Sequence, residues 1–233
     1  MKKAFTILLF CVAGASFGQT QTRILARDII KQINEGRTVE YTGVEIEGDL
    51  DLTNLSNQRL ERHSSGWFDT NETYESVVEV PVRFSNCTFL GDVLAYYHLD
   101  RRNETYIAHF EKDAIFKNCT FKRSSEFKYS EFNGQATFTG CTFYDVANFK
   151  YAEFSYGPMF NSVKFERGAD FKYTDFPRET TFEKATFYGY ANFKYTKFRS
   201  PLNMQGTAFR GDEDFKYTRI DGRSFTSHLL ERQ

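Results

Sequence analysis

Large apolar residues recur along the C-terminal half of the chain at steps that alternate between five and six. These positions are Phe110, Phe116, Phe121, Phe127, Phe132, Phe138, Phe143, Phe149, Phe154, Phe160, Phe165, Phe171, Phe176, Phe182, Phe187, Phe193, Phe198, Met204, Phe209, Phe215 and Ile220. An α-helix would scatter such positions around its axis, and a flat strand would need a period of two. The pattern therefore predicts a coil that turns a corner every five or six residues and keeps these side chains inside.

Small residues form a second column, two positions before each large residue. The column runs from Ala114 to Thr218 and consists of Ala, Cys, Ser, Thr, Val and Pro, with exceptions at Leu202 and Glu213. Because protein cores pack at crystal-like density, a narrow interior has to share each face between a large and a small side chain. The second column therefore supports the same closed coil.

The tripeptide Phe-Lys-Tyr marks the period of this coil. It begins at Phe127, Phe149, Phe171, Phe193 and Phe215, so that one turn takes 22 residues and contains four large side chains. Self-similarity at a fixed period is typical of repeat architectures. In its large and small columns the chain resembles the pentapeptide-repeat family over roughly residues 78–220.

That resemblance implies an all-β fold, a right-handed quadrilateral parallel β-helix with a large residue centred on each of four faces. The usual turn of the family consists of four steps of five, whereas this chain alternates five and six. We therefore expect bulged corners near Gln135 and Val146 and at their equivalents 22 residues on.

A short amphipathic helix is predicted before the coil. Its apolar stripe consists of Ile24, Leu25, Ile29, Ile30 and Ile33. Gly36 follows as a stop signal, and the alternation from Val44 to Leu52 then indicates strands. Because the open end of a stacked sheet invites edge-to-edge association, we expect the helix to cap the β-helix.

The first 18 residues have the pattern of a secretory signal peptide. Two lysines precede an apolar stretch at residues 4–14, and small residues lead up to Gln19. The apolar stretch is shorter than the roughly 20 residues that a membrane-spanning helix needs. A retained anchor and a lipoprotein site at Cys11 are the alternatives. The expected location of the mature chain is secreted or periplasmic.

The predicted organisation has five parts. They are a signal peptide at 1–18, a capping helix with its lead-in at 19–40, first coils with two protruding loop insertions at 41–109, a regular β-helix at 110–220, and a C-terminal cap or tail at 221–233.

Two similar segments interrupt the regularity of the coil. "NETYESVVEVPVRFSNCTF" begins at Asn71 and "NETYIAHFEKDAIFKNCTF" begins at Asn103, a step of 32 residues. We interpret the step as one turn plus a ten-residue excursion, repeated in two successive turns. Stacked excursions would place Tyr74 beside Tyr106, Trp67 beside Leu99, and Asp69 beside Arg101.

Tandem loops on one face of a solenoid are commonly where partners bind, and aromatic and arginine side chains are enriched in interaction hot spots. The candidate partner-binding residues are Trp67, Phe68, Tyr74, Tyr96, Tyr97, Arg101, Arg102 and Tyr106. The alternative is that the excursions only cover the first turns of the coil.

The Phe-Lys-Tyr repeat also predicts two ladders on the outside of the coil. The tyrosine ladder is Tyr129, Tyr151, Tyr173, Tyr195 and Tyr217, and the lysine ladder is Lys128, Lys150, Lys172, Lys194 and Lys216. Neighbouring lysines at the strand spacing repel by about 1 kcal/mol in water, and nearby carboxylates are expected to offset this. One interpretation is a basic aromatic stripe that binds a polyanion or glycan. The other, which we favour from the sequence, is a ladder that only stabilises the repeat.

Cys87, Cys119 and Cys141 all fall in the small inward column. Cys119 and Cys141 are one turn apart, so a disulfide is sterically possible. The odd number of cysteines in the mature chain, and the continuation of the column by Val163 and Ala185, favour buried thiols instead.

Charge and motifs exclude several functions. Thirty basic residues nearly balance 31 acidic ones, so no field favours nucleic acid as a partner. The four histidines share no metal-ligand spacing, and we find no phosphate loop or nucleophile motif. No catalytic residue, cofactor or metal is therefore predicted.

The sequence favours a non-catalytic extracytoplasmic binding or scaffold protein whose partner is a protein or glycan of the cell envelope. The first alternative is a carbohydrate-active β-helix enzyme. The second, implied by the resemblance, is a DNA-mimicking topoisomerase inhibitor, which the signal sequence and the near-neutral charge disfavour.

Overall fold

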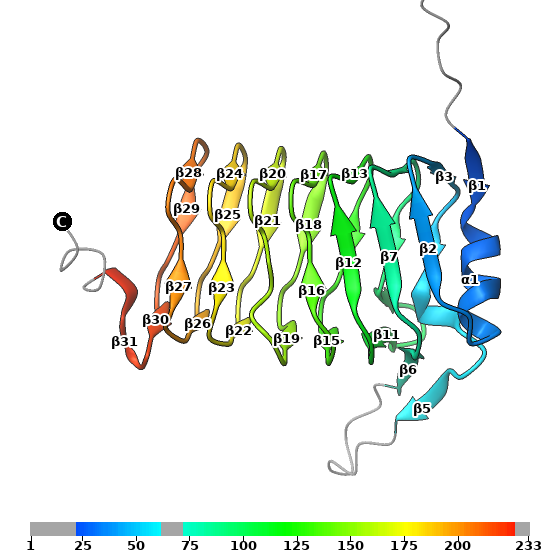
Figure 1. Cartoon of the computed structure of the whole chain (residues 1–233). Coiled ribbons are helices and arrows are strands. Elements are labelled where there is room, and N and C mark those ends of the chain that lie inside the picture. The colour runs from blue at the N-terminus through cyan, green and yellow to red at the C-terminus, as the bar shows by residue number, and fades with distance from the viewer. Residues whose placement is uncertain (1–21, 62–71, 227–233) are drawn as a thin grey trace, which may run out of the picture.

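The five-and-six steps of the sequence close into turns that stack along one axis. Figure 1 shows the computed structural model, which describes residues 22–61 and 72–226. Parallel strands from successive turns form four sheets, and each sheet is one face of the β-helix. The predicted four-faced parallel β-helix with one N-terminal helix is confirmed.

Each face is named here by a phenylalanine at its centre. The Phe138 face contains β2 (Val39–Thr42), β7 (Val82–Ser85), β12 (Ala114–Lys117), β16 (Ala136–Thr137), β23 (Thr180–Thr181) and β27 (Leu202–Asn203). Bridges through Met159 join β16 to β23. The Phe143 face contains β1 (Arg23–Leu25), β3 (Glu45–Glu47), β8 (Thr88–Phe89), β13 (Thr120–Phe121), β17 (Thr142–Phe143), β20 (Lys164–Phe165), β24 (Thr186–Phe187) and β28 (Ala208–Phe209).

The other two faces follow in chain order. The Phe149 face contains β4 (Leu50–Asp51), β9 (Val93–Leu94), β14 (Ser125–Glu126), β18 (Val146–Asn148), β21 (Gly168–Asp170), β25 (Tyr190–Asn192) and β29 (Glu213–Asp214). The Phe154 face contains β5 (Arg59–Glu61), β6 (Glu72–Val78), β11 (Glu104–Phe110), β15 (Glu131–Phe132), β19 (Glu153–Phe154), β22 (Asp175–Phe176), β26 (Lys197–Phe198), β30 (Arg219–Ile220) and β31 (Arg223–Ser224). A further strand, β10 (Tyr96–Leu99), pairs with β11.

The phenylalanine rings form one stack behind each face. Phe138, Phe160 and Phe182 are fully buried, with ring centroids 5.2 and 4.9 Å apart and planes within 6° of parallel. Rings of adjacent faces meet edge to face, as Phe160 and Phe171 do at 5.4 Å. The prediction of a single interior column through these residues is confirmed.

Small interior residues fill the space beside the rings and also satisfy backbone carbonyls. The Thr174 hydroxyl donates to the carbonyl of Phe149 at 2.7 Å, and the Cys119 thiol donates to that of Phe84 at 3.4 Å. Cys87, Cys119 and Cys141 are free and buried, so no disulfide joins Cys119 to Cys141. The neighbouring Cys141 thiol and burial together raise the pKa of Cys119 to about 12.

The five-residue and six-residue corners differ in backbone conformation. The five-residue corner before the Phe154 face places a tyrosine of the ladder in the left-handed region, as at Tyr173 with φ 63°. Some of the six-residue corners bring a glycine against an adjacent turn, and a Cβ on Gly189 would lie 1.8 Å from the carbonyl oxygen of Arg167. At these corners the extra residue therefore depends on a close backbone approach that only glycine allows.

The N-terminal end of the β-helix is covered by α1 (Ala26–Asn34), which buries Ala26, Ile29 and Ile33. The helix ends at Asn34, and Gly36 follows it with an N–H that donates to the carbonyl of Ile33 at 2.9 Å. The expected helical stripe was wrong at its start, because Ile24 and Leu25 lie in β1 and pair in parallel with β3. Backbone pairing with the first turn there outweighs the helical pattern.

The C-terminal end is covered differently. After β30 the chain reverses at Gly222, and β31 returns antiparallel to it. This hairpin buries Phe225, which stacks on Phe215 at 4.9 Å. Within the described residues no helix is long and apolar enough to cross a membrane.

Candidate partner-binding arm

The first two turns are longer than the turns that follow. Val39 pairs with Val82, a step of 43 residues, Val82 pairs with Ala114, a step of 32, and Ala114 pairs with Ala136, a step of 22. The second turn therefore has the expected ten extra residues, whereas the first has 21. The prediction of two matched ten-residue excursions was wrong for the first turn, because the 32-residue similarity begins at the returning strands β6 and β11 and does not include the outgoing ones.

Strands of both excursions form one mixed four-stranded sheet, which we call the arm. Its order is β5-β6-β11-β10, with β6 and β11 parallel in the centre and β5 and β10 antiparallel at the two edges. Figure 1 shows β5 and β6 projecting from the body of the β-helix. The returning strands pair at the 32-residue register, with Tyr74 opposite Tyr106.

The outgoing strands do not lie over each other as the turns do. β5 occupies the free edge of β6, and β10 occupies the free edge of β11. Backbone groups explain this arrangement, because β6 and β11 extend beyond the neighbouring turns and each leaves one edge unpaired there. The expected pairs Trp67 with Leu99 and Asp69 with Arg101 lie partly outside the described residues.

The register assigns side chains of the arm to two opposite faces, since alternate residues of a strand point to opposite sides. One face carries a row across all four strands, which we call the tyrosine face. This row is Leu60, Tyr74, Tyr106 and Tyr97. The other, which we call the groove face, carries two further rows. They are Glu75, Ile107 and Tyr96, and Thr73, Thr105 and His98.

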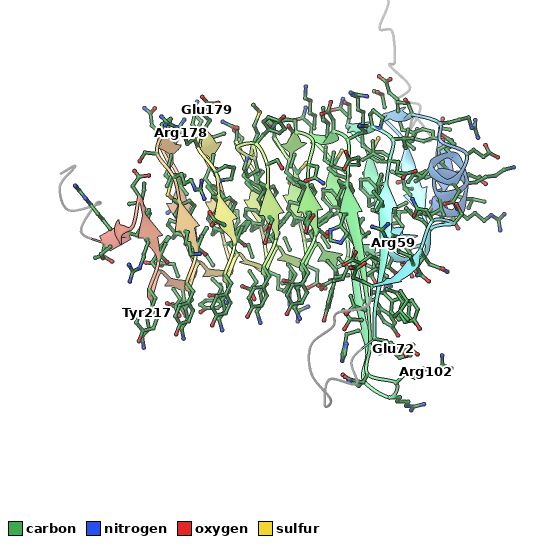
Figure 2. All side chains as sticks on the ribbon, turned by 90° about the horizontal axis from the view of Figure 1, so that it is seen from below. Arg59, Glu72, Arg102, Arg178, Glu179 and Tyr217 are labelled. Atoms are coloured by element: carbon green, nitrogen blue, oxygen red, sulfur yellow. The ribbon has the colours of Figure 1, made fainter. Side chains whose placement is uncertain are left out.

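The candidate binding residues are therefore divided. Tyr74, Tyr97 and Tyr106 share the tyrosine face, while Tyr96 belongs to the groove face. Arg101 and Arg102 lie in the turn between β10 and β11, and Figure 2 shows Arg102 at the end of the arm. Trp67 and Phe68 lie outside the described residues. Sequence reasoning missed Leu60, whose position became apparent only from the antiparallel register of β5.

The tyrosine face is ordered by aromatic contacts and by hydrogen bonds of the phenols. Tyr74 and Tyr106 stack with ring centroids 5.0 Å apart, and Tyr97 meets Tyr106 at 6.1 Å. The Tyr106 hydroxyl donates to Glu104 at 2.7 Å, which raises the pKa of Tyr106 to about 12. The Tyr74 hydroxyl donates in the same way to Glu72 at 2.8 Å, and its pKa is also raised.

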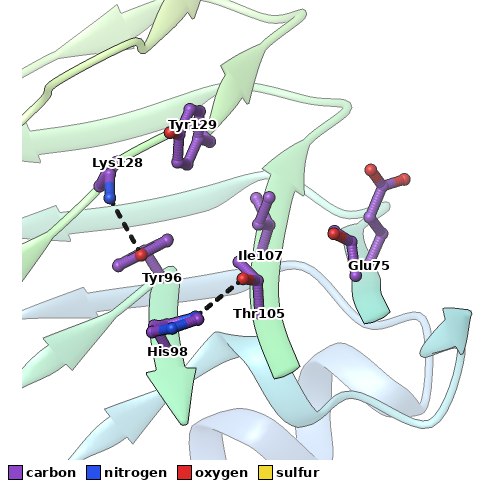
Figure 3. A pocket seen from close by; sticks show the side chains of 8 residues that line it. Glu75, Tyr96, His98, Thr105, Ile107, Lys128 and Tyr129 are labelled. Carbon is purple, nitrogen blue, oxygen red and sulfur yellow. Dashed lines mark hydrogen bonds between the residues drawn. The ribbon is translucent and has the colours of Figure 1, made fainter. Parts of the chain in front are cut away.

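The groove face closes against the β-helix around a polar groove of about 500 Å³ (Figure 3). The groove is lined by Thr73, Glu75, Tyr96, His98, Thr105, Ile107, Lys128 and Tyr129. The Lys128 ammonium donates to the Tyr96 hydroxyl at 3.0 Å, and His98 Nδ1 lies 2.9 Å from Thr105 Oγ1. Lys128 and Tyr129 link this groove to the external ladders.

The tyrosine ladder is present as predicted. Successive rings from Tyr129 to Tyr217 stack at 4.7 to 4.9 Å, and Tyr96 continues the row at 5.8 Å from Tyr129. Figure 2 shows Tyr217 on the same side of the molecule as Glu72 and Arg102 of the arm.

Each lysine of the ladder lies over the ring of the tyrosine that follows it, at 4.8 to 5.6 Å from the centroid. Among residues 22–61 and 72–226, no carboxylate lies within ion-pair distance of these five ammoniums. Carboxylates nevertheless lie near the ladder, as expected: burial raises the pKa of Asp170, and the charges of Lys150, Lys172 and Lys128 act on it in the opposite direction. The acidic side chains nearby make other bonds, as Asp170 does in accepting from the backbone N–H of Lys172.

The described part of the chain holds no group of three or more His, Cys, Asp or Glu residues placed to bind a metal ion. The arm and the ladders offer phenols, ammoniums, hydroxyls and apolar ring surface. This chemistry is suited to binding.

Comparison with known proteins gives one match. A family model described as pentapeptide repeats (9 copies) matches residues 108–153 and 149–197. The matched residues lie in the turns that follow the arm, together with the end of β11. A search of curated proteins and a search of solved structures each found no match.

Proposed function

The chain belongs to the pentapeptide-repeat family, and on this premise we propose that it is a non-catalytic binding or scaffold protein. Proteins of this family are generally non-enzymatic repeat proteins. The proposed site of action is outside the cytoplasm, because residues 1–18 have the pattern of a secretory signal. The proposed partner is a protein of the cell envelope, and the arm binds it.

The observation that carries this proposal is the tyrosine face. Leu60 and Tyr97 are 39% and 46% exposed at the two ends of a row that stacked Tyr74 and Tyr106 complete. A connected aromatic row on an exposed sheet resembles the centre of a protein interface, where tyrosine is enriched and charged residues are depleted. Arg102 lies beside this row at the end of the arm and supplies a hydrogen-bonding rim.

The β-helix provides a rigid base for the arm. The strands β6 and β11 run from the arm directly into the Phe154 face, where Val78 and Phe110 are fully buried. A surface that is fixed before binding loses little conformational entropy when a partner docks. The fold therefore supports recognition by a preformed face.

The test is a crosslinked pull-down from the cell envelope with the full mature chain and a variant that carries Tyr74→Ser, Tyr97→Ser and Tyr106→Ser. We expect the variant to remain folded and to lose the proteins that the wild type recovers, because the row supplies the apolar contact area. Equal recovery of the same proteins by both chains would show that the arm has a structural role only.

A matched control places the same substitutions on exposed tyrosines far from the arm. Tyr144, Tyr156 and Tyr188 are 49%, 59% and 47% exposed and lie on other parts of the β-helix. Replacing these three by serine should leave partner recovery unchanged. A loss equal to that of the arm variant would indicate that tyrosine content, and not the arm, controls recovery.

The location is tested separately by intact-mass analysis of the protein from its native host. We expect a chain that begins at Gln19 in the envelope or medium. Full-length protein in the cytosol would contradict the proposed location and favour a cytosolic target.

A further inference from the structure

We propose that the lysine ladder and the groove together form a binding track for a linear acidic polysaccharide. The track lies outside the tyrosine face of the arm. It shares with the proposed function only the location outside the cytoplasm, and each can fail without the other.

The first argument is that the ladder lysines lie close together and form no ion pairs. Five ammoniums follow one another along a single corner of the β-helix, where each turn donates a backbone hydrogen bond to the next, such as that from Tyr151 N–H to the Lys172 carbonyl at 3.0 Å. Within the described ranges none of the five has a carboxylate partner within 4 Å. Asp170 lies close enough for Lys150, Lys172 and Lys128 to act on its charge, but it forms no ion pair with them. The fold thus holds like charges at the strand spacing of about 4.8 Å, and a bound polyanion would relieve the repulsion that this carboxylate leaves.

The second argument is that the ammonium positions are restrained. Lys150 lies over the ring of Tyr151 at 5.2 Å, and Lys172 lies over that of Tyr173 at 5.0 Å. Cation–π contacts of this kind keep each ammonium on the outer surface beside its ring. A row of charges with a fixed repeat is complementary to a polymer that carries one negative charge in each unit. Linear polymers of uronic acids have one carboxylate on every sugar.

The third argument separates this polymer from single-stranded nucleic acid. Proteins that bind single strands stack successive bases on exposed aromatic faces. The ladder rings cover one another, with planes only 2° from parallel between Tyr151 and Tyr173 and between Tyr173 and Tyr195. The faces of Tyr151, Tyr173 and Tyr195 are therefore covered by neighbouring rings, and their hydroxyl edges and the ammoniums beside them face a ligand. Such edges donate hydrogen bonds to the hydroxyl and carboxylate groups of a sugar chain.

The groove extends the track at its N-terminal end. Lys128 belongs both to the ladder and to the groove, where its ammonium lies 4.4 Å from the centroid of Tyr96. Beyond it the lining changes from ammonium groups to Thr73, Thr105 and His98, which offer hydroxyl and imidazole groups. The groove also contains Ile107 and the carboxylate of Glu75, which can accept a hydrogen bond from a sugar hydroxyl. A polymer on the ladder would enter this groove with its sugar hydroxyls against these side chains, which would set its position along the track.

The proposal is tested by isothermal titration of the full mature chain with polygalacturonate oligomers long enough to span the ladder. The ladder variant carries Lys150→Gln, Lys172→Gln and Lys194→Gln. We expect it to bind about tenfold or more weakly than the wild type, because neighbouring contacts on one polymer reinforce each other. Binding by the wild type should weaken when the ionic strength rises from about 0.01 to about 0.15 M, since screening shortens the Debye length.

The matched control carries Lys117→Gln, Lys122→Gln and Lys164→Gln, which remove the same charge from exposed positions away from the track. It should bind as the wild type does. Equal loss in the two variants, or no binding by the wild type, would overturn the proposal. Binding of a single-stranded oligothymidylate as tight as that of polygalacturonate would overturn the choice of a polysaccharide.

Thermal unfolding separates a binding role from a structural one. If the lysines serve a ligand, the ladder variant should unfold at the same temperature as the control or higher, because repulsion is removed. A lower unfolding temperature with unchanged polymer binding would show that the lysines only stabilise the ladder. The serine variant of the tyrosine face should still bind polygalacturonate, so failure of the track and failure of the arm give different results.

Discussion

The regular turns and the first turn build the same four faces from partly different side chains. In the regular turns each face is centred on a phenylalanine that stacks on identical rings, such as Phe143 on Phe165 at 5.3 Å. In the first turn Ile46 stands where Phe89 and Phe121 stand in the next two turns, whereas Tyr41 keeps an aromatic ring and stacks on Phe84 at 6.1 Å. A ring stack needs a flat ring above and below it, whereas branched side chains can fit the uneven surface of a helix.

The two regions also differ in whether an insertion can be accommodated. In the regular turns every strand edge is occupied by the strand 22 residues on, so an insertion would interrupt two neighbours. The first turns lie beside α1, and β6 and β11 extend past the neighbouring turns into the arm. The end of a solenoid is therefore where this chain accommodates a binding surface without interrupting the stack.

The largest effect is expected from breaking a ring stack in the regular turns. Phe160→Ala should lower the free energy of unfolding by about 3–5 kcal/mol, because the ring is fully buried between Phe138 and Phe182. Chemical denaturation measures the change. The control is Met159→Ala at the position next to Phe160 in the chain. The Met159 side chain is 42% exposed, so its removal should change the free energy of unfolding by less than about 1 kcal/mol. A loss under about 1 kcal/mol for Phe160→Ala would contradict the buried stack.

A smaller effect is expected at the longer corners. Gly189→Ala should cost about 1–3 kcal/mol, because its Cβ would lie 1.8 Å from the Arg167 carbonyl oxygen and the turns would have to separate. Gly36→Ala serves as the comparison, since no atom lies within 4 Å of its Cβ and only its φ of 68° is unfavourable. The denaturation midpoint of Gly189→Ala should lie below that of Gly36→Ala. Equal losses would mean that the corner relaxes freely.

The sequence predicted the regular turns well because one physical constraint repeats there. A side chain that points inward meets the same neighbours in every turn, so the steps of five and six specify strand, face and register together. Phe138, Phe160 and Phe182 show this, and the family model matches the same region.

The arm was predicted less well, for a reason of backbone pairing. The 32-residue step gave the register of Tyr74 and Tyr106, since both belong to strands that continue a face of the β-helix. No sequence period encodes where an outgoing strand will pair. β5 pairs with the free edge of β6, and β10 pairs with the free edge of β11. This pairing places Leu60 and Tyr97 on one face of the arm and Tyr96 on the other. The same limit explains β1, where pairing with β3 replaced the predicted start of the helix.

The tyrosine ladder should contribute a moderate amount to stability. Tyr173→Ala removes two stacks, with Tyr151 and Tyr195, and should cost about 1–2 kcal/mol. Tyr173→Gly should be less harmful than Tyr173→Ala by up to about 1 kcal/mol, because φ is 63° at this position and glycine adopts that conformation without strain. Calorimetric melting of both variants checks the order. If alanine proved the better replacement, backbone strain at the corner would not be significant.

The smallest effect concerns the arm alone and appears at alkaline pH. The hydrogen bond from the Tyr106 hydroxyl to Glu104 requires a protonated phenol, and it raises the pKa of Tyr106 from 10.0 to about 12. A pKa raised by folding gives stability that is fully present below the ordinary value and is lost as the pH rises through the folded value. The arm should therefore loosen between pH 10 and about 12, while the interior phenylalanine stacks of the regular turns contain no group that titrates. Absorbance titration of the wild type minus that of Tyr106→Phe isolates this phenol, and Glu104→Ala should move its midpoint back toward 10. A midpoint near 10 in the wild type would show that the bond to Glu104 does not persist, and the arm would then owe its order to ring stacking and backbone pairing.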